Sequence, residues 1–436
     1  MSSSFLSAPL DPTTSERLIV QGFAAHIVAS ADTAAVDAWA DAVRRGFLDS
    51  EATADELAAM RERFEPERKT GIYDPSAPDD DIPVATLSSW ISDLSVPGGR
   101  GISSCAISCV TVSPTHHRRG LARSLVEGEL RTAASLGIPM AMLTVSESTL
   151  YGRYGFGPAA MSAKITIDVK RASWTGPVPD GRVDFISRAQ LRALAPALHE
   201  RVRPEMPGEL EIPAGRWDSF AGTRPDAKDA RERRAVQYRD ASGEVRGLAV
   251  YVVKENSDDF TKSRALVQYL LAETADAYAS LWRFLVELDL IGTVEADLLA
   301  VDEPIIWMIS DQRAATVTLR DHQYLRILDL PVALEARRYG AAGSLVLDVT
   351  DPLGVTTGEW LLTVDGDGRG RVSPLGAEVP DDAVRVRLGI TELSAAYLGG
   401  VSIATLAAAG RVATADVATA TRILSWHVTP RLSFWY

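Results

Sequence analysis

The sequence predicts an α/β fold followed by an α+β unit, and three observations lead to this prediction. A strand, a basic turn and a helix follow one another in "TVSPTHHRRGLARSLVEGEL". Two strands and a helix recur in "RGLAVYVVKENSDDFTKSRALVQYLLAETADAYASLWRFLVELDL". Later stretches place strands before a small-residue helical segment, the order of an α+β unit. With 436 residues the chain is too long for one core. We expect domains at 1–160, 161–320 and 321–436.

The first domain begins with helical patterns and continues into strands. The segments "TAAVDAWADAVRRGFL" and "DELAAMRERFEPERK" carry apolar residues at helical spacing. "DIPVATLSSWISDLSVPGGRGISSCAISCVTVSP" reads as a hairpin whose second strand leads into the basic turn. This α/β order predicts a first domain that ends near residue 160.

The basic turn has the features of an anion site. Pro114 stops the strand because proline has no N–H to donate. Leu121, Leu125 and Leu130 then recur on one helical face, so Gly120 marks the start of a helix. Free N–H groups and the positive end of the dipole favour an anion there. Taken alone, the turn fits a solvated loop equally well, and it lacks the lysine of a Walker loop.

Beyond the helix the sequence predicts a short buried strand and a glycine-aromatic turn. A second, degenerate copy of the two strands and the helix follows. The strand is "IPMAMLTVS", and the turn "ESTLYGRYGFGPA" contains Tyr151 and Tyr154. In the second copy, Ala272, Glu273 and Thr274 stand where the first has its arginines and glycine. A carboxylate at the helix entry repels phosphate. The second copy is therefore predicted to pack and not to bind a coenzyme.

Composition narrows the class of partner. The formal net charge of −13 argues against nucleic acid and favours a cationic substrate. We expect no secretory signal, because the first residues have no basic start and no long apolar segment, and no membrane span. A cytoplasmic location fits these features, and secretion is the alternative that they leave open. The six histidines form no metal-ligand spacing with cysteines or carboxylates, so we expect no metal.

The basic turn resembles the pyrophosphate-binding element of the GNAT acetyltransferase superfamily. The superfamily pattern Gln/Arg-x-x-Gly-x-Gly/Ala reads here as "HRRGLA", with a histidine in first place. An acetyltransferase domain, a degenerate copy and a sterol carrier protein-like tail together resemble the Eis (enhanced intracellular survival) family. The stretches that carry this resemblance are "VSPTHHRRGLARSL", "SESTLYGRYGFGPA", "YLRILDLPVALEARRY" and "YLGGVSIATLAAAGRV".

The resemblance implies roles for individual residues. Tyr151 matches the family's general acid, and the carboxylate of the last residue, here Tyr436, matches its general base. Asp49 and Asp321 fall near positions that line an acidic substrate pocket. The family's acetyl-CoA contacts match the strand residues Val110, Thr111 and Val112, the turn and helix residues Arg118, Arg119, Gly120, Leu121, Ala122 and Arg123, and the pair Ser146 and Glu147.

The acid and the base suit the chemistry of acetyl transfer to different degrees. The reaction needs a neutral amine, an acceptor for its proton and a donor for the leaving thiolate. A phenol with an ordinary pKa near ~10 is close to a thiol at ~8.5, so Tyr151 fits the donor. A terminal carboxylate, at roughly 3.5, is a poor base in water and needs desolvation or a bridging water.

The leading hypothesis is an acetyl-CoA-dependent N-acetyltransferase that acts on bulky cationic amines by direct attack in a ternary complex. Aminoglycosides and lysine side chains are the expected substrates, and the family implies a homo-oligomer, a hexamer. A second route would use Cys109 as an acyl carrier, but the sequence places no activating group beside it. The alternative function is a lipid or sterol carrier that keeps vestigial acetyltransferase domains.

Overall fold

The structure is a computed structural model that describes residues 2–224, 227 and 229–436. Backbone contacts divide the chain into two units. The first contains the segments up to Ala159, Gln323–His427 and Tyr436. The second contains Ala160–His322 and Val428–Trp435. Two strands, β6 (Gly157–Asp168) and β12 (Ala315–Ile327), include residues of both units.

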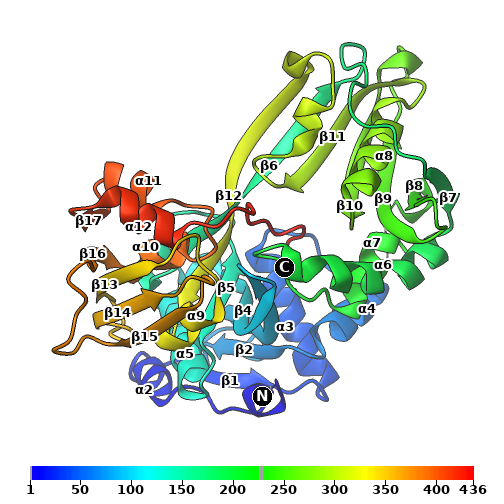
Figure 1. Ribbon diagram of the computed structural model, residues 1–436. Helices are drawn as coiled ribbons and strands as arrows, with labels where there is room; N and C mark the ends of the chain where they lie inside the picture. The colour runs from blue at the N-terminus through cyan, green and yellow to red at the C-terminus, as the bar shows by residue number, and fades with distance from the viewer. Residues whose placement is uncertain (1, 225–226, 228) are drawn as a thin grey trace. The chain divides into compact units, whose positions relative to one another are not determined.

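The first unit holds a sheet with the strand order β1-β2-β3-β4-β5-β12 (Figure 1). Neighbours from β1 to β4 are antiparallel, β4 and β5 are parallel, and β12 is antiparallel to β5. The strand that the sequence predicts before the basic turn is β4, and "IPMAMLTVS" forms β5. The bounds are β1 Ala24–Val28, β2 Arg68–Tyr73, β3 Ala85–Val96, β4 Arg100–Val112 and β5 Met140–Thr144.

Two helices of this part of the unit, α3 and α4, begin at side-chain caps. Asp32 caps α3, and Thr53 with Glu56 forms a capping box at α4. The helix that follows Gly120 is α5. One face of this helix, with Leu121, Leu125 and Leu130, belongs to the core that also contains residues of β4 and β5. The bounds are α1 Ser2–Leu6, α2 Pro12–Val20, α3 Thr33–Gly46, α4 Ala54–Phe64 and α5 Leu121–Ser135.

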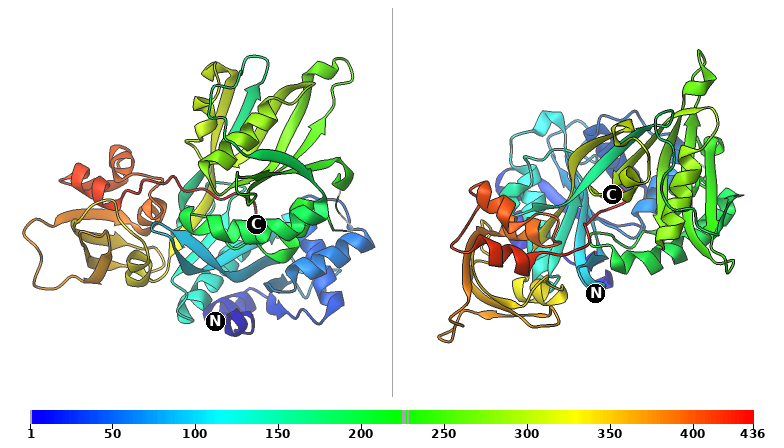
Figure 2. Two further views of the ribbon diagram at one scale, coloured as in Figure 1. Left: turned by 45° about the vertical axis from the view of Figure 1, so that its right-hand side comes forward. Right: turned by 45° about the horizontal axis from the view of Figure 1, so that its top comes forward.

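The later part of the first unit is an α+β arrangement, as the sequence predicts. Its five strands have the order β15-β14-β13-β16-β17, with β13 and β16 parallel. Both views in Figure 2 show this part of the chain in yellow-orange to red. The bounds are α9 Leu330–Ala336, β13 Gly343–Thr350, β14 Gly358–Val364, β15 Gly370–Pro374, β16 Val384–Gly389, α10 Ile390–Ala396, α11 Ile403–Ala408, β17 Val412–Thr414 and α12 Val417–Leu424.

The second unit repeats the central pattern of the first. Its strand order is β6-β11-β10-β9-β8-β7; β9 and β10 are antiparallel, and α8 connects β10 to the parallel β11. This matches β3, β4, α5 and β5 of the first unit. The bounds are β7 Arg182–Ile186, α6 Arg188–Val202, α7 Ala214–Ala221, β8 Arg233–Arg239, β9 Val245–Lys254, β10 Ser263–Ala272, α8 Ala275–Val286 and β11 Ile291–Leu299.

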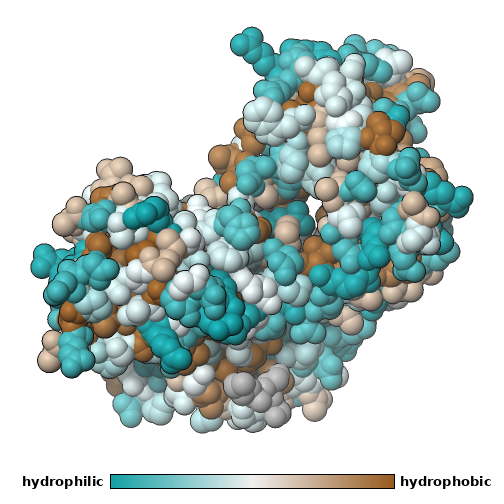
Figure 3. All heavy atoms as spheres, viewed as in Figure 1, coloured by the Kyte–Doolittle hydropathy of each residue, from teal (hydrophilic) through white to brown (hydrophobic). Residues whose placement is uncertain are grey.

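Each unit has its own hydrophobic core. Ile107, Leu143 and the apolar face of α5 form one in the first unit, and Trp282 with Leu285 is central in the second. The face of the molecule seen in Figure 3 is largely hydrophilic, with scattered hydrophobic residues. In the part of the chain that the structure describes, no helix is long and apolar enough to cross a membrane.

Candidate active site

An opening in the first sheet defines the candidate site. Among the described residues, β4 pairs with β5 only over Ser104–Ile107 and Met140–Leu143, although β4 continues to Val112. The last residues of β4, including Val110 and Thr111, therefore have no strand partner on the β5 side. Backbone N–H and C=O groups seek partners, so this edge is suited to bind an extended, amide-containing ligand.

A bulge in β4 precedes this edge. The register between β3 and β4 shifts between Thr86 and Ser88, so that Leu87 lies opposite both Cys109 and Val110. Cys109 has a φ of +51°, which is uncommon for a residue with a side chain. The Thr86 hydroxyl lies 2.9 Å from the Cys109 carbonyl oxygen, to which it donates a hydrogen bond. An extra residue bends a strand, which accounts for the separation of β4 from β5.

The predicted anion site has the local geometry that an anion needs. Gly120 is the N-cap of α5 with a φ of +79°, and no side chain caps the helix. Ser124 donates the first helical hydrogen bond, to Gly120, which leaves the N–H groups before it outside the helical pattern. A Cβ at position 120 would have no neighbour within 4 Å. The backbone is therefore accessible, as close approach of a pyrophosphate requires.

Side chains around the turn are partly engaged within the protein. His117, at the departure from the superfamily pattern, lies with Nε2 3.0 Å from the Val112 carbonyl oxygen, so it spans the turn. The Arg119 guanidinium lies 5.9 Å from the centre of the Phe23 ring. Arg118 is exposed and adopts a φ of +63°.

Farther along α5, Arg123 donates a 2.6 Å hydrogen bond to Glu127. Its charge is therefore already paired within the helix, whereas Arg118 and Arg119 stand at the exposed turn.

A buried histidine also supports the turn, and the sequence did not single it out. His116 Nε2 lies 3.0 Å from a carboxylate oxygen of Asp74, and its Nδ1 lies 2.8 Å from the Thr115 hydroxyl. Hydrogen bonds from Ser76 and His116 lower the pKa of Asp74 to about 2. Because Asp74 is 42 residues away from His116 in the chain, neither spacing nor motif points to this pair.

Tyr151 lies at the N-cap of a 3₁₀ turn, Gly152–Tyr154. Its ring packs edge-on against Phe156 at 6.1 Å between centroids, and it is half-buried. Burial, followed by Tyr154 and Glu147, raises the pKa of Tyr151 to about 12. The phenol is thus protonated at neutral pH and a weaker acid than the ordinary value near 10 assumed from sequence.

The terminal residue lies in the first unit, although the residues before it belong to the second. The Thr144 hydroxyl donates a 2.8 Å hydrogen bond to the main-chain oxygen of Tyr436. The Tyr436 ring meets Trp90 edge-on, with centroids 5.4 Å apart. The ring of Tyr436 is therefore docked against the sheet, at Trp90 of β3.

The remaining predicted residues are less closely grouped. Ser146 and Glu147 are exposed in the loop after β5, and Glu147 acts on the pKa of Tyr151. Asp49 is exposed in the first unit, with its N–H bonded to the carbonyl of Arg44 in α3. Asp321 is half-buried on β12, in the second unit.

The second copy differs from the first at its helix entry. Thr274 caps α8, and its hydroxyl accepts a hydrogen bond from the Ala277 N–H. Glu273 is paired with Arg201 and Arg246 at 3.0 and 3.1 Å. At the start of α8, a capping hydroxyl and a carboxylate therefore stand where α5 has an uncapped N-terminus. These contacts support the prediction that this copy does not hold a phosphate.

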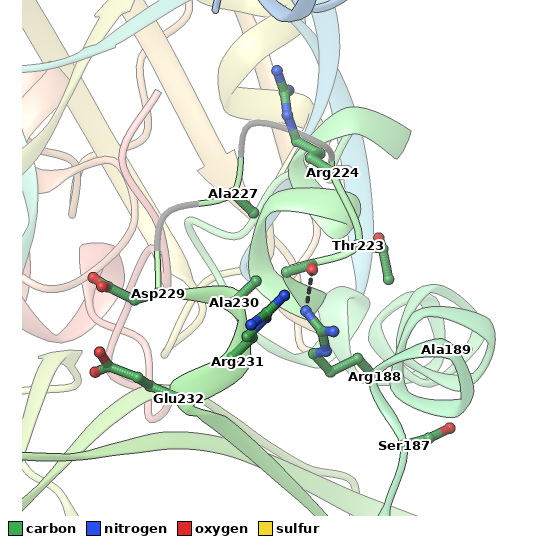
Figure 4. A pocket seen from close by; sticks show the side chains of 11 residues that line it. Ser187, Arg188, Ala189, Thr223, Arg224, Ala227, Asp229, Ala230, Arg231 and Glu232 are labelled. Atoms are coloured by element: carbon green, nitrogen blue, oxygen red, sulfur yellow. Dashed lines mark hydrogen bonds between the residues drawn. The ribbon is translucent and has the colours of Figure 1, made fainter. Parts of the chain in front are cut away.

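The second unit also contains a hollow of mixed charge (Figure 4). Arg188 and Arg231 line it together with Asp229 and Glu232, and Arg188 donates a 2.7 Å hydrogen bond to the Gly222 carbonyl oxygen. None of the residues predicted to bind the coenzyme lines it.

Comparisons with known families agree with this architecture. Two domains described as acetyltransferase (GNAT) match residues 28–159 and 208–327, and a sterol carrier protein domain matches residues 330–433.

Individual relatives extend the likeness to most of the chain. A protein of Streptomyces avermitilis named as an uncharacterized N-acetyltransferase is 37% identical over 88% of this chain and 91% of its own length. The N-acetyltransferase Eis of Mycobacterium tuberculosis is 34% identical over 74% of this chain and 77% of its own. The crystal structure of Eis1 from Mycobacterium abscessus has a TM-score of 0.78 at 25% identity and covers 94% of this chain and 100% of its own. The chain therefore belongs to the Eis-like family of GNAT N-acetyltransferases, with two GNAT domains and a C-terminal sterol carrier protein-like domain.

Proposed function

We propose that this enzyme transfers the acetyl group of acetyl-CoA to amines of bulky cationic substrates, by direct attack in a ternary complex. Acetyl-CoA is the cosubstrate that its GNAT domains imply. The observation that carries the proposal is the uncapped N-terminus of α5, which follows the end of β4 that has no strand partner on the β5 side. Aminoglycosides and protein lysines are the substrate class that we infer.

The first unit offers binding groups for the pantetheine arm and for the pyrophosphate of the coenzyme. Backbone groups of Val110, Thr111 and Val112 bind the pantetheine arm, with the Val112 carbonyl already bonded to His117. The pyrophosphate lies at the N–H groups of Leu121, Ala122 and Arg123, next to Arg118, Arg119 and Gly120, and Ser146 and Glu147 complete the site. Two exposed guanidinium groups beside a helix N-terminus favour a dianionic group.

Tyr151 serves as the proton donor in this proposal. With its pKa raised to about 12, it stays protonated and donates a hydrogen bond to the negative charge that develops on sulfur. The terminal carboxylate of Tyr436 accepts the proton that the amine loses. A carboxylate is negatively charged at neutral pH, so it also attracts a cationic amine toward the site.

Direct transfer is favoured over an acyl-cysteine route by the state of Cys109. Its thiol is buried, and burial raises its pKa, so that the thiolate needed for attack is disfavoured. The Ser108 hydroxyl, 3.7 Å away, is the hydrogen-bonding neighbour of this thiol. A histidine or carboxylate that would activate it is absent from its described partners.

Substrate recruitment rests on charge. The net charge of −13 attracts polyamines over long distances, and Asp49 and Asp321 are the residues we assign to the substrate side. We assign coenzyme chemistry to residues 1–160, a packing role to 161–320 and delivery of the terminal carboxylate to 321–436. Assembly as a homo-hexamer completes the proposal.

Incubation of the enzyme with acetyl-CoA and a panel of amines tests this function. Mass spectrometry should detect a gain of one acetyl group on aminoglycosides, and little on small neutral amines. A thermal-shift comparison of acetyl-CoA with a fatty acid addresses the carrier alternative. Stabilisation by the fatty acid alone, with no acetylated product from any amine, would favour a lipid carrier.

A further inference from the structure

Four side chains form a chain of contacts beside the basic turn of the first unit. The Arg119 guanidinium lies over the Phe23 ring, 5.9 Å from its centre, and the His116 ring meets Phe23 edge-on at 6.0 Å between centroids. His116 is held in turn by Asp74, whose carboxylate oxygen lies 3.0 Å from Nε2. We call Phe23, Asp74 and His116 the Arg119 support.

The sheet register brings the Arg119 support to one end of the first sheet. Ala24, the first residue of β1, pairs with Tyr73, the last residue of β2. Phe23 and Asp74 are therefore the next residues on two neighbouring strands. The start of β3 pairs with the end of β4 at the same end of the sheet, so the basic turn that follows β4 lies there as well.

The position of Phe23 is fixed by the end of α2. The Phe23 N–H donates a 2.9 Å hydrogen bond to the Leu18 carbonyl. The Gly22 N–H donates to the Ile19 carbonyl at 3.0 Å. The two bonds form a Schellman motif, in which Gly22, with a φ of +84°, takes the left-handed position. Phe23 is 6% exposed and belongs with Leu18 to the core of the first unit.

Asp74 orients the imidazole of His116. One carboxylate oxygen of Asp74 accepts hydrogen bonds from the N–H and the hydroxyl of Ser76, at 2.9 and 2.6 Å, and the other faces Nε2. An ionised carboxylate only accepts hydrogen bonds, so Nε2 carries the hydrogen, and Nδ1 of the neutral ring accepts from the Thr115 hydroxyl, 2.8 Å away. Both ring nitrogens are thus engaged, which holds the edge of the imidazole against Phe23.

An arginine supported in this way binds an anion at a lower entropic cost than an unsupported one. The ring attracts the guanidinium, whose N–H donors stay available for a phosphate oxygen. Because the contact already limits the rotamers of the long side chain, less conformational entropy is lost on binding. Among the described residues of the turn, Arg119 lies over a ring and Arg118 does not.

We propose that Phe23 is a positioning residue that preorganises Arg119 for the pyrophosphate of acetyl-CoA. Asp74 and His116 hold the Phe23 ring in its orientation. The inference rests on the proposed function, in which the turn after β4 binds that pyrophosphate. It gives a role to residues outside the superfamily pattern, which begins here at His117. Their effect is on coenzyme binding and not on the transfer step.

A double-mutant cycle in the full chain tests the contact between Phe23 and Arg119. Phe23→Leu keeps an apolar side chain in the core and removes the ring, so the Kd for acetyl-CoA in calorimetry should rise about fivefold, the size of an exposed cation–π contact. The kcat should stay unchanged. The rise should persist beside Arg118→Ala and disappear beside Arg119→Ala. An equal rise in both backgrounds would overturn the inference.

Asp74→Ala tests the support without a change in the core. It releases His116 and should raise the Kd for acetyl-CoA by about threefold in the otherwise intact chain, with no further rise beside Arg119→Ala. A general structural role would weaken binding in both backgrounds. A rise that survives Arg119→Ala would therefore overturn the role of Asp74 and His116.

S-acetylpantetheine, which carries the acetyl thioester but no pyrophosphate, separates the inference from the proposed function. Its kcat/KM for transfer to an aminoglycoside should be the same in the wild type and in Phe23→Leu, and a loss equal to that with acetyl-CoA would overturn the inference. A wild type that does not bind acetyl-CoA would overturn the proposed function and the inference together. Binding that Phe23→Leu leaves unchanged, in a variant that melts as cooperatively as the wild type, would overturn the inference alone.

Discussion

Arg326 and Asp351 form an ion pair whose side chains are both fully buried. Arg326 Nη2 lies 2.8 and 2.7 Å from the two carboxylate oxygens, and its Nε donates a 2.8 Å hydrogen bond to the Tyr154 carbonyl. In the same region, the Thr391 hydroxyl of α10 donates to the Gly152 carbonyl at 3.3 Å. The sterol carrier protein-like domain thus holds the turn that begins at Tyr151.

Replacing Asp351 should therefore destabilise the protein strongly. Asp351→Asn leaves the Arg326 charge buried without its counter-charge, and such losses cost about 3–5 kcal/mol. Chemical denaturation should show this as a lower unfolding free energy. Asp348→Asn, which removes the partner of Arg387 in a largely exposed pair, is the matched control and should cost under about 1 kcal/mol. Similar costs in both variants would contradict the importance of burial.

The ion pair between Arg326 and Asp351 should also make the stability of the protein depend on pH. Burial raises the pKa of Asp351, but Arg326 and the N–H groups of Leu353 and Thr356 outweigh it, so the pKa is lowered overall. A lowered carboxyl pKa contributes stability above the unfolded value near ~3.9, and this contribution is lost as pH falls through the folded value. Below about pH 4 the wild type should lose more stability than Asp351→Asn.

Coenzyme binding should depend on the open backbone at Gly120. Gly120→Glu places a carboxylate where the pyrophosphate approaches and should raise the KM for acetyl-CoA more than tenfold. Gly137→Glu is a matched control, because Gly137 has a φ of +73° and equally open surroundings at the other end of α5. It incurs the same backbone strain and should leave acetyl-CoA affinity unchanged. Unchanged affinity of Gly120→Glu in calorimetry would refute the phosphate assignment.

Local patterns in the sequence were sufficient for the family and the fold class. The proline after β4 and the helical spacing that follows Gly120 depend only on neighbouring residues, and the structure places α5 where they predict it. The repeat was visible because both copies keep the same order of strands and helix. The second copy has no glycine beside Glu273, where the first copy has Gly120, and this difference already distinguished the two copies.

Features formed by residues distant in sequence were not predictable in this way. The bulge at Cys109 depends on the register between β3 and β4, and nothing in the alternation of apolar residues reveals the extra residue. Thr144 is an ordinary residue at the end of a strand until Tyr436, 292 positions later, lies beside it. Sequence reasoning also assumed an ordinary pKa for Tyr151, because burial appears only in the folded chain.

Removing the hydroxyl of Tyr151 should lower kcat without unfolding the protein. Tyr151→Phe keeps the ring that packs on Phe156, so only the proton donor is lost, and kcat should fall by about 10²-fold. Because the pKa of Tyr151 is raised to about 12, the wild type should show no loss of kcat from its ionisation at pH values well below 12. Steady-state kinetics over a pH series checks both statements.

Tyr154→Phe is the control for that substitution. Tyr154 is buried in the same turn, and its main chain, not its hydroxyl, accepts the hydrogen bond from Arg326. It should keep kcat within about threefold. An equal loss in Tyr154→Phe, or a loss below threefold in Tyr151→Phe, would argue against Tyr151 as the acid.

The proposed role of the terminal carboxylate can be tested by a change to the main chain, which no side-chain substitution reproduces. A short Gly-Ser extension converts the carboxylate of Tyr436 into an amide, moves the negative charge away and adds bulk beside Thr144, so acetylation should collapse. Affinity for acetyl-CoA should remain, since the proposed coenzyme contacts lie at 110–123 and 146–147. Tyr436→Phe keeps both the carboxylate and the ring that meets Trp90, and it should retain most of the activity. A normal kcat on an aminoglycoside in the extended enzyme would show that the docked terminus only packs against the sheet.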